Sequence, residues 1–202
     1  MNRRQASRQE TRQLILTAAR LLFAQKGMEE CTIRDIAKAA GVSPASVVVH
    51  FKSKTALLEE ALNRDIENAL AGLTASMPGD QSLLERLMHL ATGFFRLYDQ
   101  NRNLYRALIR HTIFEPVSET PDMTNLSQRY LRFLAGMIEA EQNRGRIKPE
   151  VAPMMAAAAC FSLYLGALIL LFRQPEMAVA SVAEVLAAMT SQYLAGITGD
   201  NP

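Results

Sequence analysis

The stretch AGVSPASVVVHFKSK, residues 40–54, contains more helix-ending and helix-starting residues than one continuous helix allows. Gly41 suits the left-handed conformation that ends a helix, and Ser43 followed by Pro44 is a typical start of the next one. That next helix must be short, because Ser53 begins another. The sequence therefore predicts two short helices joined by a three-residue turn, which is the layout of a helix-turn-helix.

Helical periodicity extends over the rest of the chain, and the alternation of apolar and polar residues typical of strands is nearly absent. Ser7–Glu10 has the form of a capping box, in which a hydroxyl and a carboxylate satisfy each other's free backbone N–H groups, and Thr32–Asp35 resembles a second helix N-terminus. We therefore expect an all-α fold of about nine helices, with a head over residues 1–54 and a body over residues 55–202. The predicted helices cover residues 7–26, 32–40, 43–50, 53–73, 82–100, 102–114, 121–144, 149–173 and 176–197.

Positive charge is concentrated in the predicted head. Residues 1–54 contain ten Lys and Arg but four Asp and Glu, a net charge of +6, whereas the rest of the chain carries −4. A basic segment joined to an acidic body is typical of a protein whose basic segment alone binds a polyanion.

The sequence contains no familiar catalytic or metal-binding pattern. G-x-S-x-G, G-x-x-x-x-G-K-[ST] and G-x-G-x-x-G are all absent. The two cysteines, Cys31 and Cys160, have neither metal-ligand nor disulfide spacing, and the three histidines lie far apart in the sequence. We therefore expect no enzymatic activity, no metal and no cofactor, and a reduced, cytoplasmic protein without a signal peptide.

Residues 151–172, VAPMMAAAACFSLYLGALILLF, carry no charge and are long enough to span a bilayer. The abundance of Ala, the position of Pro153 near the start and the lack of a flanking basic cluster or aromatic belt argue against a membrane span. A helix that is apolar all round is also typical of a subunit interface or a central core helix. We therefore expect no membrane contact, and a membrane-anchored protein is an alternative that solubility without detergent would exclude.

The candidate DNA contacts lie around the short helix that begins at Ser43. In a helix-turn-helix, small or polar side chains at the start of the second helix enter the major groove and contact base edges. Val48 suits contact with a thymine methyl group, while Lys52 and Lys54 suit contact with phosphate. The alternative is a solvent-exposed helical corner, against which the position and charge of the head argue. The predicted DNA contacts are Thr32, Arg34, Ser43, Pro44, Ala45, Ser46, Val48, His50, Lys52 and Lys54.

The segment TIRDIAKAAGVSPASVVVHFKSKTALLEEAL resembles the DNA-binding domain of TetR-family transcriptional regulators. The resemblance extends over residues 10–62, and beyond them only the helix count and the chain length are similar to the family. Two departures concern the recognition helix: Val48 stands where the family commonly has a tyrosine, and Pro44 and Ala45 replace the commoner Lys-Gly pair. The residues that match the family pattern are Thr32, Ile36, Ala37, Ala40, Gly41, Val42, Ser43, Phe51, Lys54 and Leu57.

The resemblance implies an N-terminal three-helix helix-turn-helix DNA-binding domain joined to a helical ligand-binding and dimerisation domain. It further implies a homodimer, formed through residues 149–173 and 176–197, that represses by binding double-stranded operator DNA. A small-molecule effector, apolar or aromatic, would release the operator. The phosphate contact that the family's tyrosine makes is then lost here or moved to His50. The alternative is a helical ligand-binding or scaffold protein without sequence-specific DNA binding, which salt-dependent binding to duplex DNA would distinguish.

Candidate effector-binding residues lie in the predicted body. Aromatic and Met-rich walls adapt to apolar ligands, although most such residues in any helical body belong to its core. The candidates are His89, Phe94, Tyr98, Arg110, His111, Phe114, Phe133, Met137, Phe161 and Tyr164.

Overall fold

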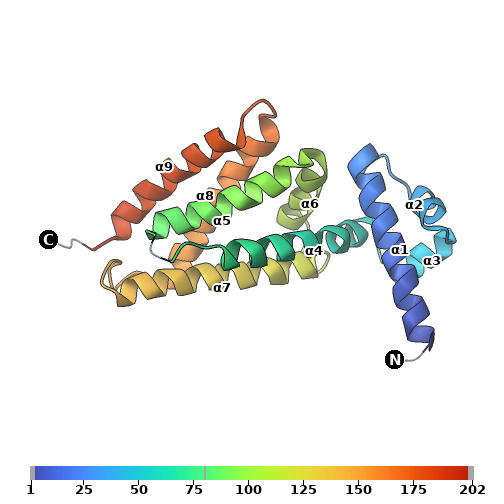
Figure 1. Cartoon of the computed structure of the whole chain (residues 1–202), viewed down its shortest axis with the longest axis horizontal. Coiled ribbons are helices and arrows are strands. Elements are labelled where there is room, and N and C mark those ends of the chain that lie inside the picture. Colours follow the sequence, from blue (N-terminus) through green and yellow to red (C-terminus); the bar gives the residue numbers. More distant parts are fainter. Residues whose placement is uncertain (1–2, 80, 200–202) are drawn as a thin grey trace. The chain divides into compact units, whose positions relative to one another are not determined.

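The computed structural model describes residues 3–79 and 81–199 of the chain, and within these ranges it contains nine α-helices and no strand (Figure 1). The prediction of an all-α fold is confirmed for this part of the chain. The helices are α1 Arg3–Lys26, α2 Ile33–Ala40, α3 Pro44–His50, α4 Lys54–Ala75, α5 Leu83–Asp99, α6 Arg102–Phe114, α7 Pro121–Asn143, α8 Pro153–Arg173 and α9 Val179–Ile197.

The chain divides into two compact units. The head unit consists of Met1–Glu67 and Asn101–Thr124, and the body unit consists of Asn68–Gln100 and Asn125–Pro202. The head unit therefore holds α6 as well as α1–α3, because α6 contacts α1. The compact units differ from the expected division into residues 1–54 and 55–202, because each unit consists of two separate segments of the chain.

Local capping interactions fix the helices of the head at the predicted residues. The Thr32 hydroxyl accepts from the backbone N–H of Asp35 at 3.1 Å, and the Asp35 carboxylate accepts from the backbone N–H of Thr32 at 3.0 Å. Gly41 has a φ of 68°, a left-handed conformation that ends α2. Ser43 caps α3 and Ser53 caps α4, each with its hydroxyl oxygen accepting a backbone N–H.

The predicted helix start at Ser7 is wrong, because α1 already begins at Arg3. Ser7 lies within the helix, where its carbonyl oxygen accepts a hydrogen bond from the Thr11 hydroxyl at 3.0 Å. Arg, Gln and Ala are good helix formers, so the residues from Arg3 to Ala6 extend the helix beyond the capping-box pattern.

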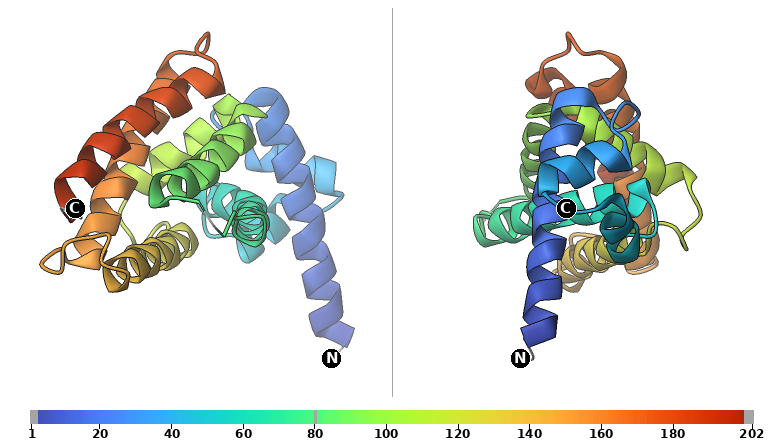
Figure 2. Two further views of the ribbon diagram at one scale, coloured as in Figure 1. Left: turned by 60° about the vertical axis from the view of Figure 1, so that its left-hand side comes forward. Right: turned by 90° about the vertical axis from the view of Figure 1, so that its right-hand side faces the viewer.

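In the body unit, α5 packs against α8 and α9, and α8 packs against α9 (Figure 2). Among the described residues α8 is the one helix that is long and apolar enough to cross a membrane, by length and composition alone. Ala157, Ala167 and Leu171 on α8 are fully buried within the fold. One side of α8 is therefore part of the core of the body unit.

Candidate DNA-binding site

Helix α3 turns one side to the head core and the other to solvent. Val47 is fully buried, which fixes the rotation of the helix about its axis. Val48 and Val49 are 60% and 72% exposed, and Ala45 is exposed on the same side. These small apolar side chains at i, i+3 and i+4 form a face that can approach base edges and thymine methyl groups. Val49 was not among the predicted contacts, although its helical spacing from Ala45 indicates this position.

The start of α3 places further predicted residues at the same end of the helix. Ser43 and Pro44 are exposed, and Ser46 is half-buried. The Ser43 Oγ accepts the backbone N–H of Ser46 at 3.1 Å, so its own O–H remains available as a donor to DNA.

The predicted phosphate contacts differ in their surroundings. Arg34 and Lys52 are exposed. Lys54 is half-buried, and its Nζ donates to the carbonyl oxygens of Cys31 at 3.2 Å and Glu29 at 3.4 Å. The Thr32 hydroxyl also donates to Asp35 at 2.7 Å while it caps α2. Lys54 therefore closes the loop that leads into α2, and a DNA contact by Lys54 or Thr32 stays a prediction.

Arg12 on α1 holds the end of α3 in place. Its Nε donates to Oε1 of Glu60 at 2.8 Å, and a second guanidinium nitrogen pairs with Oε2 of the same carboxylate. The remaining nitrogen donates to the carbonyl oxygen of His50 at 2.8 Å, and the guanidinium lies over the ring of Phe51 at 4.4 Å from its centroid. One side chain thus ties the last residue of α3 to both α1 and α4. Sequence analysis missed this role, because no local pattern pairs residues so far apart.

His50 is half-buried at the end of α3. Burial lowers the pKa of its imidazole, and the nearby Arg8 and Arg12 lower it further. The ring is therefore neutral at pH 7, so it can donate one N–H to a phosphate but cannot supply a charge.

Polar contacts join α6 to the helices of the head. Arg110 pairs with Glu29 at 2.6 Å, and this hydrogen bond lowers the pKa of the Glu29 carboxyl. The Tyr105 hydroxyl donates to Asp65 at 3.5 Å, and Arg20 on α1 pairs with the same carboxylate at 2.7 Å. Movement of α6 would therefore strain contacts with α1, α4 and the loop before α2.

A second connection within the head unit involves the buried Glu59 of α4. Its carboxylate accepts the backbone N–H of Met123, in the first turn of α7, at 2.6 Å. Burial raises the pKa of this carboxyl, and the neighbouring Asp122 raises it further. Glu59 thus caps α7 from α4, in place of the usual cap from a residue just before the helix.

Four of the predicted effector residues meet in an aromatic cluster of the body unit. Phe94, Tyr98, Phe161 and Tyr164 join Phe95, Tyr130 and Phe172, with ring centroids between 5.4 and 6.2 Å apart. Burial raises the pKa of Tyr98 to about 12 and that of Cys160 to about 11, so both stay protonated at neutral pH. A cavity of about 20 Å³ lies beside Tyr130, Cys160 and Tyr164, room for a single water molecule.

The other predicted effector residues are distributed elsewhere. Arg110, His111 and Phe114 belong to the head unit, where Phe114 is 79% exposed. The His89 Nε2 contacts the carbonyl oxygen of Leu73 at 3.1 Å and Ser76 Oγ at 3.2 Å, so this histidine joins α5 to the end of α4. On α7, Phe133 is half-buried and Met137 is buried.

Comparisons with known proteins agree with this architecture. Residues 15–61 match the family model described as bacterial regulatory proteins, tetR family. The chain is 26% identical over 197 residues to the HTH-type transcriptional regulator UidR of Escherichia coli K12, and the aligned residues cover 96% of this chain and 98% of UidR.

Two solved structures are similar over nearly the whole chain. Salmonella enterica GusR is 26% identical with a TM-score of 0.66, over 92% of this chain and 95% of GusR. Native NalD, described as the secondary repressor of the MexAB-OprM multidrug efflux pump in Pseudomonas aeruginosa, is 26% identical with a TM-score of 0.64, over 96% of this chain and all of NalD. Because the head matches the family model and the similarity to whole regulators extends through both compact units, this chain belongs to the TetR family of DNA-binding transcriptional regulators.

Proposed function

We propose that this regulator is a repressor that binds its operator as a homodimer and releases it when an apolar or aromatic ligand enters the body unit. The observation that carries the proposal is the exposed face of α3, which Arg12 and the buried Val47 hold in one orientation. A rigid helix with small side chains toward solvent can enter the major groove and read bases by contact. The description of the similar NalD as a repressor supports the direction of regulation.

The dimer in this proposal forms through α8 and α9. Met155, Gly166 and Ile169 lie on one side of α8 at helical spacing, and all three are exposed, Met155 at 70% and Ile169 at 54%. Val185 on α9 is also partly exposed. Apolar side chains in such positions are typical of a subunit interface. The exposed Gly166, with open space where a Cβ would lie, is the best position to test this interface.

Ligand release follows from the way the chain connects the aromatic cluster to the head. Tyr98 lies in the last turn of α5, and α6 begins three residues after α5 ends. A ligand that enlarges the 20 Å³ cavity must displace the rings that line it, and one of these, Tyr130, lies 5.9 Å from Phe94 of α5 between ring centroids. The displacement then reaches α6, which belongs to the head unit and whose Tyr105 and Arg110 are bonded to Asp65 and Glu29. The seven rings of the cluster favour a ligand that is itself apolar or aromatic.

The test begins with selection of bound sequences from a random duplex pool by the full-length protein. We expect a near-palindrome whose half-site centres lie one helical turn, or a multiple of it, apart. Binding to the selected site should weaken steeply with salt, because phosphate contacts release counterions. If no sequence is enriched, the helical ligand-binding or scaffold alternative is correct, and a single unrepeated site would contradict the homodimer.

A substitution on the exposed side of α8 tests the dimer. Gly166→Arg should give monomers with weakened operator binding, measured by sedimentation, while the circular dichroism spectrum stays unchanged. Ala167→Arg is unsuitable as a second test, because Ala167 is fully buried within the body unit. A screen of apolar and aromatic metabolites for release of the selected duplex then tests the ligand class. Release by a compound that binds the Gly166→Arg monomer equally well would place its site within one subunit.

A further inference from the structure

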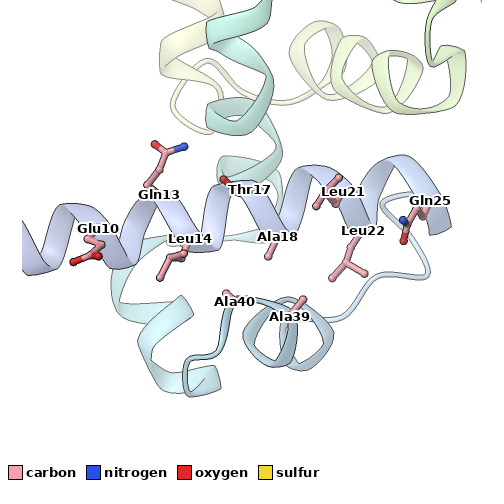
Figure 3. Close-up of a pocket in the computed structure, with 10 residues that line it drawn as sticks. All are labelled: Glu10, Gln13, Leu14, Thr17, Ala18, Leu21, Leu22, Gln25, Ala39 and Ala40. Carbon is pink, nitrogen blue, oxygen red and sulfur yellow. The ribbon is translucent and has the colours of Figure 1, made fainter.

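An apolar groove on the head lies between α1 and the end of α2. Leu14, Ala18 and Leu22 point from α1 toward Ala39 and Ala40 (Figure 3). The groove has a volume of about 600 Å³, and Leu14 and Leu21 on its α1 wall are 51% and 57% exposed. Leu14 and Leu21 lie one beside the other on this wall, which makes the groove a candidate surface for a partner.

The charge of the groove excludes a polyanion as that partner. Among its ten lining residues Glu10 is the one charged group, and Gln13, Thr17 and Gln25 are the polar ones. The Glu10 carboxylate would repel a phosphate backbone, and the apolar side chains cannot bind one. The groove is therefore separate from the basic surface that contacts DNA.

Six of the eight α1 side chains that line the groove follow a symmetric order about a point between Thr17 and Ala18, whereas Gln13 and Leu22, at the edges of the six, differ from each other in polarity. Leu14 and Leu21 are equally far from this point, and so are Glu10 and Gln25. With 3.6 residues per turn, these six positions fall on one stripe about 100° wide along the helix. A two-fold axis exchanges each residue with the same residue of a second copy, so in an antiparallel pair of these helices Leu14 would lie opposite Leu21, Thr17 opposite Ala18, and Glu10 opposite Gln25.

We propose that this groove binds the same groove of a second copy of the chain, with the two α1 helices antiparallel. Small residues at the crossing point let the helices approach closely. Each Leu14 then packs against Leu21 of the second copy, above the small side chains of Ala18, Ala39 and Ala40. At both ends the amide of Gln25 donates to the Glu10 carboxylate of the other copy. A self-complementary patch of this kind is what an interface with two-fold symmetry requires.

The contact joins neighbouring dimers and is weak. A single pair of helices buries less area than the roughly 1,200–2,000 Å² of a stable complex. The two heads of one operator-bound dimer lie at least one helical turn of DNA apart, about 34 Å, so we assign the contact to heads of neighbouring dimers. Dimers on adjacent sites have a high effective concentration, which makes a weak contact sufficient for cooperative binding. This cooperativity rests on the proposed function, whereas the contact between heads does not.

Disulfide trapping tests the contact without DNA. Thr17 is exposed beside the proposed axis, and the native Cys31 and Cys160 are buried. Thr17→Cys should form a covalent link between copies under mild oxidation, while the matched Gln9→Cys, exposed on α1 about 130° away from the stripe centre, should not. Equal linking of both variants, or of neither, would overturn the proposal whether or not the protein represses transcription.

A charge change at Gln25 tests the same contact on DNA. Gln25→Lys creates an ion pair with Glu10 of the second copy at both ends, and Gln25→Glu creates two repulsions. On a duplex with two selected sites, Gln25→Lys should raise the cooperativity about two- to tenfold and Gln25→Glu should lower it. A duplex with one site is the control. If both variants change cooperativity in the same direction, or if they change the affinity for the one-site duplex by as much as for the two-site duplex, the groove does not bind a second copy.

Discussion

Replacement of Arg12 by lysine tests whether the orientation of α3 determines operator recognition. Lysine keeps the positive charge, so the general attraction to DNA is unchanged. An ammonium group cannot form the fork to Glu60, donate to the His50 carbonyl and lie over Phe51 at the same time. Arg12→Lys therefore removes the geometry of the contact and leaves its charge.

The magnitude follows from the exposure of the groups involved. The Arg12 and Glu60 side chains are 38% and 29% exposed, so their ion pair contributes at most about 1 kcal/mol. The hydrogen bond to the His50 carbonyl and the contact with Phe51 contribute about another 1 kcal/mol together. We expect Arg12→Lys to lower the free energy of unfolding by about 1–2 kcal/mol. If that loss appears as disorder at the end of α3, operator affinity falls about five- to thirtyfold.

The assay compares Arg12→Lys with Arg20→Lys on a selected operator and on a random duplex. Arg20 lies on the same helix and pairs with Asp65, away from α3, so its replacement controls for loss of an ion pair in the head. Arg12→Lys should weaken operator binding and leave random-duplex binding nearly unchanged, and Arg20→Lys should affect neither. Equal weakening on both duplexes, or equal behaviour of the two variants, would refute a role for Arg12 in orienting α3.

The remaining substitutions address polar contacts of Glu59, Glu141 and Lys54. Glu59→Gln keeps an acceptor for the Met123 N–H without a buried charge. Because the pKa of Glu59 is raised, the stability of the wild type falls as the pH rises above about 4.5. Urea denaturation should therefore show that Glu59→Gln gains stability relative to the wild type over that range. Glu141 on α7 pairs with Arg86 on α5 at 2.7 Å, and the two side chains are 4% and 12% exposed. Glu141→Gln should lower the free energy of unfolding by about 3 kcal/mol at pH 7, because Arg86 would remain buried without its partner, and Glu141→Gln/Arg86→Met should recover most of this in thermal denaturation. The hydrogen bond from Arg146 lowers the pKa of Glu141, so the difference between wild type and Glu141→Gln should shrink as the pH falls below about 4.5. Lys54→Ala should lower stability by about 1 kcal/mol through the lost bonds to the Glu29 and Cys31 carbonyls, and an unchanged melting temperature with a flatter salt dependence would assign Lys54 to DNA alone.

The features that sequence analysis predicted correctly in the head depend on neighbours along the chain. The cap at Thr32, the left-handed Gly41 and the start of α3 at Ser43 each involve residues within about one helical turn. Such interactions leave a pattern of residue types at fixed spacing. The same locality explains the error at Ser7, where the pattern was present but good helix formers before it extended the helix.

The features that sequence analysis missed join residues that are distant in sequence. Arg12 and Glu60 are 48 positions apart, Arg86 and Glu141 are 55, and Glu59 and Met123 are 64. A single sequence carries no spacing rule for such pairs. The effector residues show the same limit, because aromatic residues in a helical body can be listed from the sequence but grouped only when the helices pack. Tyr130 joins the cluster through α7, while Phe114 on α6 remains exposed.

The discontinuous head unit has a consequence for synthesis of the chain. Residues 1–67 leave the ribosome before α6, yet α6 and the segment up to Thr124 belong to the same compact unit. At 5–20 residues per second, the nascent head waits roughly 3–11 s for the helix that completes it. During this interval the α1 surface that α6 later covers is open to chaperones. A fragment that ends at residue 67 would keep this surface open permanently, so a separately produced DNA-binding fragment of this regulator should aggregate more readily than the full-length chain.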